Sequence, residues 1–234
     1  MRGKNGMTGP ILAVGLVIAA AVGDLCAGET LKVGIFTGSG SVATGEVARL
    51  LKEEGMEAYL FSPKDLSKGN IYAYDVLYFG GGWKESNWTD LAGRMHIVEY
   101  ARARGCGVIF SSFRCGCSAR TSIRTIFPEI GEGKNKCNTT EMIVTDKTHP
   151  ITQGLPERFM HPFWDHTVMK VGPDGKVLAV DGGENVTLLC GETGKGRAVY
   201  IGSFLGLDWQ GEPVYPLDVN DRKLRHGSKH AVFG

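Results

Sequence analysis

The sequence lacks several features that would point to common function classes. Neither sign of charge is in excess, with 26 Lys and Arg against 25 Asp and Glu, so we expect no nucleic-acid partner. No apolar run reaches the roughly 20 residues of a transmembrane helix. Cys115-Gly-Cys117 is tighter than ordinary metal-ligand spacing and has no matched second pair, so no metal site is predicted. Internal repeats and long linkers are absent too, which indicates one domain.

The longest apolar run lies at the amino terminus. It extends from Ile11 to Val22 and follows Arg2 and Lys4, which is typical of a secretory signal peptide. We therefore predict a cleaved signal over residues 1–27, a secreted or periplasmic protein, and no stable membrane span after cleavage. An uncleaved amino-terminal anchor is the alternative.

The cysteines and asparagines bear on this prediction of export. Of the six cysteines, Cys26 belongs to the predicted signal, which leaves an odd number for an oxidising compartment. Two disulfides with one remaining thiol is one interpretation, and a fully reduced protein is the other. Glycosylation sequons begin at Asn87, Asn138 and Asn185, and they matter only in a host that glycosylates.

Apolar runs alternate with helical periodicity in the first half of the chain. Runs at Leu31–Phe36, Glu57–Phe61, Asp75–Phe79 and Val108–Ser111 predict strands, and helical spacing lies between them. This alternation predicts an α/β fold, a flavodoxin-like, doubly wound and mostly parallel sheet. The second half shows strand patterns without long helices, so we expect an antiparallel-leaning C-terminal extension. The domain should span residues 28–214, followed by a polar tail over 215–234.

Ligands of open α/β sheets gather beyond the carboxyl ends of the strands. Four segments should meet there: 37–41, 80–83, 112–117 and the residues after Ser203. Thr37-Gly-Ser-Gly-Ser41 favours a tight turn over a nucleotide cradle, because no ribose-binding acid follows the second strand. We expect no cofactor, and a small-molecule or carbohydrate ligand at this edge. The oligomeric state is not predicted.

The candidate catalytic residue is Cys115. It follows a buried strand at a sharp turn into a predicted helix start, where backbone N–H groups lower a thiol pKa and hold an oxyanion. Gly80, Gly81, Gly82, Trp83 and Gly116 are candidate oxyanion or ligand contacts on the neighbouring loops.

A cysteine nucleophile also needs a base, which is usually histidine. His161-Pro-Phe-Trp-Asp-His166 places two imidazoles, an acid and aromatic rings within six residues, which suggests a catalytic or sugar-contacting loop. His161 and His166 are therefore candidate catalytic residues, and a place in the core or on the surface is the alternative. His149 precedes Pro150 in a turn and is interpreted as structural.

Several segments together resemble the class I glutamine amidotransferase-like superfamily. They are Phe79-Gly-Gly-Gly82, the elbow Ser112-Phe-Arg-Cys-Gly-Cys-Ser-Ala119 and Phe127-Pro-Glu129. His149-Pro-Ile-Thr-Gln-Gly-Leu-Pro156 and Gly194-Lys-Gly-Arg-Ala-Val-Tyr200 are similar to ThuA-like (trehalose-utilisation) proteins. The elbow with the first glycine-rich loop equally resembles biotin-protein-ligase N-terminal-like domains. The resemblance extends from about Leu31 to Leu207.

This resemblance implies a flavodoxin-like sheet with Cys115 as nucleophile, and with the Gly81 and Gly116 amides as the oxyanion hole. The chain departs from the pattern where Phe113 and Cys117 replace flanking glycines. It departs again at Gly206-Leu-Asp-Trp209, where the family carries a histidine; Asp208 in this segment is a candidate ligand contact. Two hypotheses follow: an exported hydrolase or carbohydrate-processing protein of ThuA-like type, or a non-catalytic ligand-binding or interaction domain that has lost the triad.

Overall fold

The computed structural model describes residues 30–38, 44–80, 90–111, 125–138, 141–153, 155–159 and 165–202. All described strands belong to one sheet, whose main order is β2-β1-β3-β4-β11-β10-β9-β6-β7. The strands of its first half are β1 (Lys32–Phe36), β2 (Glu57–Phe61), β3 (Val76–Phe79), β4 (Gly107–Ser111) and β11 (Gly196–Ile201). The predicted signal peptide and polar tail lie outside the described residues.

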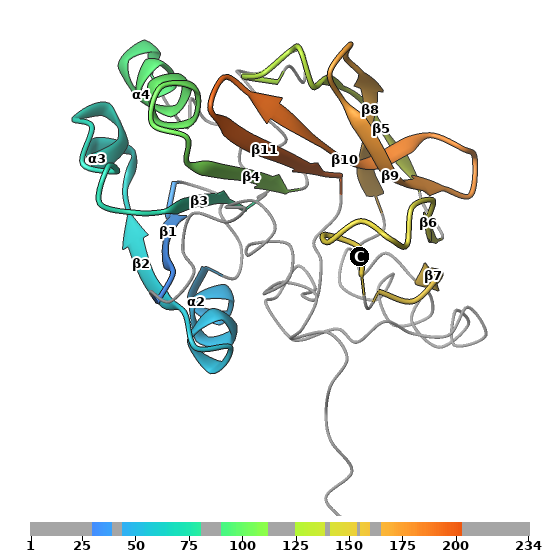
Figure 1. Cartoon of the computed structure of the whole chain (residues 1–234), viewed down its shortest axis with the longest axis horizontal. Coiled ribbons are helices and arrows are strands. Elements are labelled where there is room, and N and C mark those ends of the chain that lie inside the picture. The colour runs from blue at the N-terminus through green and yellow to red at the C-terminus, as the bar shows by residue number, and fades with distance from the viewer. Residues whose placement is uncertain are drawn as a thin grey trace, which may run out of the picture.

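The first half of the sheet is parallel. β1 pairs in parallel with β2 and β3, and β4 pairs in parallel with β3 and β11. The strands of this half therefore all end at the same edge, and they run side by side in Figure 1.

The second half of the sheet is antiparallel. Its strands are β5 (Gly131–Asn138), β6 (Met142–Val144), β7 (Arg158–Phe159), β8 (Asp165–Val171), β9 (Lys176–Asp181) and β10 (Val186–Thr193). Six antiparallel pairings stand against four parallel ones among the described strands. The α/β class and the antiparallel second half agree with the prediction, but a mostly parallel, flavodoxin-like sheet is not confirmed. Antiparallel pairings outnumber parallel ones because β5 and β8, which the sequence analysis did not predict, add antiparallel partners.

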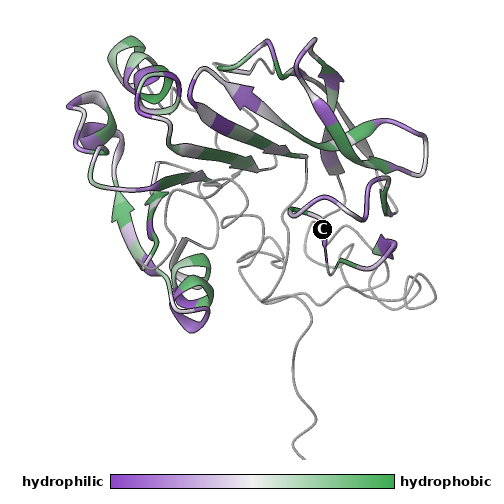
Figure 2. Ribbon diagram, viewed as in Figure 1, coloured by the Kyte–Doolittle hydropathy of each residue, from purple (hydrophilic) through white to green (hydrophobic). Residues whose placement is uncertain are grey.

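Helices cover both faces of the parallel half (Figure 1). α2 (Thr44–Glu53) buries Val47, Leu50 and Leu51 against one face. α3 (Pro63–Ser67) and α4 (Leu91–Arg102) bury Leu66, Ile97 and Tyr100 against the other. Two apolar layers result because alternate residues of a strand face opposite sides. Figure 2 shows apolar residues along these strands and polar residues on the outer faces of the helices.

The ends of the helices follow from local sequence. The Asp90 carboxylate caps α4 by accepting the backbone N–H of Gly93 at 2.7 Å, and Ser62 and Asp65 form a capping box on α3. Gly55 and Gly105 follow α2 and α4 at φ +82°, a left-handed conformation that ends helices and favours glycine.

Candidate functional site

The carboxyl ends of three parallel strands form the described part of the expected ligand edge. Phe79 pairs with Phe110, and Ser111 pairs with Ile201. β3, β4 and β11 therefore end beside one another, and the first residues at this edge are Gly80, Ser111 and Gly202. All of these residues are small, which lets backbone and ligand groups approach closely.

A buried hydrogen bond joins two of these strands just below the edge. The hydroxyl of Tyr78 on β3 lies 3.0 Å from that of Ser111 at the end of β4. Tyr78 and Ser111 are 9 % and 1 % exposed. Each hydroxyl is therefore shielded from water and has the other as its hydrogen-bond partner. The pair fixes the point from which the predicted Cys115 elbow departs.

Aromatic rings fill the opposite face beneath the same edge. Phe79 and Phe110 stack with ring centroids 5.0 Å apart, and Phe36 lies 5.3 Å from Phe79. A Cβ on Gly38 would fall 1.9 Å from the Phe36 ring. The glycine after β1 therefore serves close packing against Phe36, and the rest of the predicted turn, residues 39–41, lies outside the described residues.

Gly202 lies in a clamp between β8 and β10. Its N–H donates to the Thr187 carbonyl at 2.6 Å, and its carbonyl accepts from the Thr167 N–H at 2.9 Å. A Cβ at this position would lie 1.9 Å from the Thr167 carbonyl oxygen. The exit of β11 is therefore tied on both sides to the antiparallel half of the sheet.

Next to this clamp lies a buried polar cluster. His166 Nε2 donates to Asp181 Oδ2 at 2.9 Å, and the two residues are 1 % and 5 % exposed. The Asp181 carboxylate also accepts from the backbone N–H groups of Gly183 and Asn185 and from Asn185 Nδ2. Burial alone raises the pKa of Asp181, but these donors outweigh it and lower the pKa below its usual value.

His166 was expected in a loop, but the structure places it in strand β8. Cys137 and Asn138 of β5 pair with His166 and Asp165. Because β8 is a strand through this pairing with the distant β5, the local sequence does not predict it. A neutral imidazole that donates from Nε2 has an acceptor Nδ1. In the described structure, His166 is a buried partner of Asp181.

A thiol–imidazole pair lies on the α2 face of the sheet. Cys190 Sγ on β10 is 3.7 Å from His149 Nε2, and the Ile151 N–H donates to His149 Nδ1 at 3.3 Å. That bond leaves the proton of a neutral imidazole on Nε2, directed at the sulfur. Burial raises the pKa of Cys190 to about 11 and lowers that of His149. The neutral pair is therefore stable, and Cys190 is not an activated nucleophile.

The same contacts explain the His-Pro-Ile-Thr motif as a packing unit. The His149 carbonyl accepts from the N–H groups of Thr152 and Gln153, and Ile151 is buried in the core beneath α2. The interpretation of His149 as a structural turn residue agrees with these contacts. The sequence did not indicate its partner Cys190, because 41 residues separate the two.

Most predicted site residues lie outside the described part of the chain. Only Gly80 and His166 fall within it, at the end of β3 and in β8. Outside it are Cys115, His161, Gly81, Gly82, Gly116, Trp83 and Asp208. Sequence reasoning missed Tyr78, Ser111 and Asp181; the Asp181-Gly-Gly turn was the available signal for the last of these.

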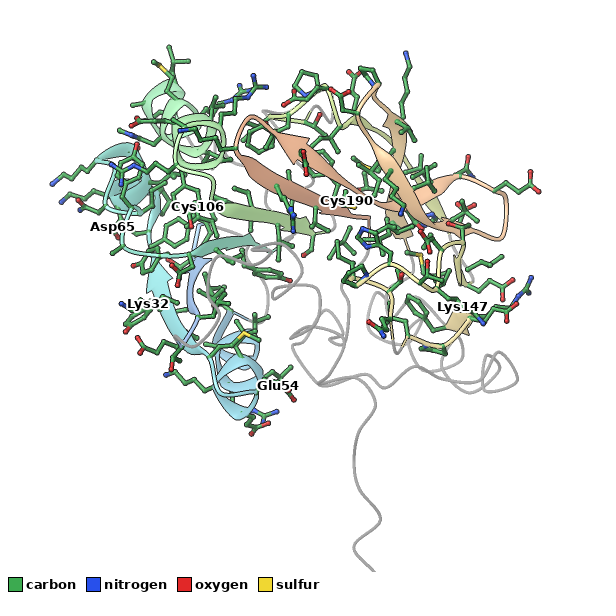
Figure 3. All side chains as sticks on the ribbon, viewed as in Figure 1. Lys32, Glu54, Asp65, Cys106, Lys147 and Cys190 are labelled. Atoms are coloured by element: carbon green, nitrogen blue, oxygen red, sulfur yellow. The ribbon has the colours of Figure 1, made fainter. Side chains whose placement is uncertain are left out.

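Two reduced cysteines, Cys106 and Cys190, belong to the described ranges. They lie far apart in Figure 3. Two reduced cysteines leave three others outside the predicted signal, Cys115, Cys117 and Cys137, which can form at most one disulfide. The interpretation with two disulfides and one thiol is therefore wrong. No group of three His, Cys, Asp or Glu side chains in the described residues could hold a metal ion. Among these residues, no helix has the length and apolarity needed to cross a membrane.

No protein-family model and no curated protein matches the chain. Solved structures do. A protein assigned as a GMP synthase subunit from Thermoplasma acidophilum has 17 % identity and a TM-score of 0.53, and the match covers 74 % of this chain and 84 % of that one. A glutamine amidotransferase from Thermotoga maritima has 10 % identity and a TM-score of 0.52, with 76 % of each chain covered.

The mmIFT52 N-terminal domain is similar over a larger part of this chain. It has 8 % identity and a TM-score of 0.54, and the match covers 87 % of this chain and 98 % of that one. At such low identities, the likeness is one of fold. The chain therefore shares a fold with these glutamine amidotransferase-type structures.

Proposed function

We propose that this protein is an exported amidotransferase-like domain that binds a small-molecule or carbohydrate ligand at the carboxyl-terminal edge of its parallel strands. The observation that carries the proposal is the common end of β3, β4 and β11 at Gly80, Ser111 and Gly202. In α/β sheets, this edge is the usual place for ligands.

The predicted site residues follow these strand ends closely in the sequence. Gly81, Gly82 and Trp83 follow Gly80 at the end of β3, Cys115 is the fourth residue after Ser111, and Asp208 is the sixth after Gly202. Chain connectivity therefore supports one shared site for the candidate contacts.

Binding without catalysis is favoured by the engagement of the described imidazoles. His149 is bonded to Cys190, His166 to Asp181 and His96 to Tyr72. The chain also carries Leu207 where the resembled family carries a histidine. Since thiolate chemistry needs a base, these residues support a domain that kept the fold and lost the triad.

A second candidate function is thiol-dependent hydrolysis of ThuA-like type, with Cys115 as nucleophile and His161 as base. It is favoured by the position of Cys115 shortly after the buried end of β4, in an elbow similar to that of the amidotransferases and of biotin-protein-ligase N-terminal-like domains. In either case, we expect a secreted or periplasmic protein that does not bind nucleic acid.

Two measurements on the purified full chain test these functions. The first is thermal unfolding with a panel of mono- and disaccharides that includes trehalose. A ligand at a hundred times its Kd stabilises by about 2.7 kcal/mol, which raises the melting temperature by about 5 °C for a domain of this size. Asp208→Asn should abolish the shift, and Asp218→Asn in the predicted tail should retain it. If no compound gives a shift, the binding proposal fails.

The second measurement is iodoacetamide labelling between about pH 5 and pH 9, with Cys115→Ser as control. Labelling of Cys115 with an apparent pKa well below the usual ~8.5 would favour the hydrolase. A disulfide-linked or unreactive Cys115 would exclude thiol catalysis and leave binding as the function.

A further inference from the structure

The third predicted glycosylation sequon, Asn185-Val186-Thr187, begins in the turn between β9 and β10. Although Asn185 lies at the surface, its side chain faces inward to a carboxylate. Asn185 Nδ2 is 3.0 Å from both Asp181 Oδ1 and Oδ2, and the Asn185 backbone N–H donates to Oδ1 at 2.9 Å. A glycan would be attached to this same Nδ2 atom, which already serves Asp181.

The carboxylate that Asn185 contacts is itself buried and holds His166. Asp181 accepts from His166 Nε2, from Gly183 and from Asn185, and every one of these contacts is a donation to the carboxylate. Loss of the Asn185 amide would leave a buried charge with fewer donors, which is costly in a protein interior.

The last residue of the sequon is also unsuitable for recognition. Thr187 has no exposed surface, and its hydroxyl has no hydrogen-bond partner among the residues that the structure describes. Glycosylated Asn-x-Thr segments lie at the protein surface, whereas Thr187 is buried in the sheet, where its carbonyl accepts a hydrogen bond from the Gly202 N–H.

We propose that Asn185 is a positioning residue that holds Asp181 against His166, and that its sequon is not modified in the folded protein. The cluster also supports the end of β11. His166 precedes Thr167, and the backbones of Thr167 and Thr187 bond to the carbonyl and the N–H of Gly202. This inference goes beyond the proposed ligand function, and its tests need no ligand.

Two substitutions that both destroy the sequon separate the roles. Asn185→Asp is nearly isosteric, removes the Nδ2 donors and places a second carboxylate beside Asp181. Thr187→Val keeps Asn185 and the side-chain shape, and it removes only the Thr187 hydroxyl. We expect Asn185→Asp to lower the melting temperature by at least about 5 °C. Thr187→Val should melt at the same temperature as the unmodified protein or higher. Equal effects of the two variants would overturn the positioning role.

Two readouts on the unsubstituted full chain keep the inference testable if Asn185→Asp does not fold. Peptide mass spectrometry of the folded protein secreted from a glycosylating host should find Asn185 without glycan, and a glycan there would overturn the proposal. Proton NMR should show an exchange-protected Nε2–H of His166, and rapid exchange of this proton would also overturn it. The signal should persist in Thr187→Val and be lost in Asn185→Ser, which removes the amide without adding charge.

Discussion

The hydroxyl groups of Tyr78 and Ser111 lie 3.0 Å apart in the interior, where β3 and β4 end. This contact joins two strands that 33 residues of chain separate, and it lies directly below the proposed ligand edge. Since Ser111 is the last residue of β4, the bond sets the position from which the chain continues toward Cys115.

Replacing Tyr78 with Phe should destabilise the protein, because the buried Ser111 hydroxyl loses its partner. We expect a loss of about 1–2 kcal/mol in the free energy of unfolding, measured by urea titration. The exposed Tyr59→Phe serves as the control and should change it by less than about 0.5 kcal/mol. Adding Ser111→Ala should recover part of the loss, and full additivity of the two changes would contradict the direct bond.

Replacing Gly202 with Ala should be strongly destabilising for a steric reason. The new Cβ would lie 1.9 Å from the Thr167 carbonyl oxygen, so β8 or β11 must move, at a cost of about 3 kcal/mol. The matched control is Gly45→Ala in α2, where nothing lies within 4 Å; there we expect a gain of up to about 1 kcal/mol. Thermal unfolding of both variants would test the clamp, which a stable Gly202→Ala protein would disprove.

Cys190 should react slowly with iodoacetamide in the folded protein. Its pKa is raised to about 11 by burial, so at about pH 8 roughly one thiol in a thousand is ionised. We expect labelling about a hundredfold slower than in concentrated urea, where the thiol has its usual pKa of ~8.5. Peptide mapping after timed labelling measures this ratio. Equal rates in the two conditions would mean that Cys190 is accessible and ionised.

The Asp181 carboxylate should contribute to acid sensitivity. Its folded pKa is lowered below the usual 3.8, so its stabilising contribution is present above about pH 4 and is lost as the pH falls through the lowered folded value. Asp181→Asn should therefore reduce the free energy of unfolding by about 2 kcal/mol near pH 6. Between about pH 4 and pH 2, the free energy of unfolding of Asp181→Asn should fall by less than that of the unsubstituted protein.

Urea titrations over the same pH range measure this difference. The exposed Asp174→Asn is the matched control and should follow the unsubstituted protein at each pH within about 0.5 kcal/mol. Parallel acid profiles for Asp181→Asn and the unsubstituted protein would show that Asp181 does not carry the effect.

The parallel half of the fold was predictable because its signals are local. Each predicted strand from Leu31–Phe36 to Val108–Ser111 is a short apolar run. Gly55 and Gly105 follow the helices α2 and α4 and end them. In contrast, β5 (Gly131–Asn138) has almost no apolar residues. It is a strand because β8 lies beside it, and that pairing has no local signature.

The candidate site divides in the same way. The chain's own pattern was enough to place glycines and small residues at the carboxyl ends of β3 and β4, because turn residues after a buried strand mark its end. It could not show that His149 meets Cys190 or that His166 meets Asp181, since each pair comes from strands and turns far apart in the chain. Burial and hydrogen bonding of these polar groups exist only after the sheet has closed around them, so the tertiary structure decided which histidines have buried partners.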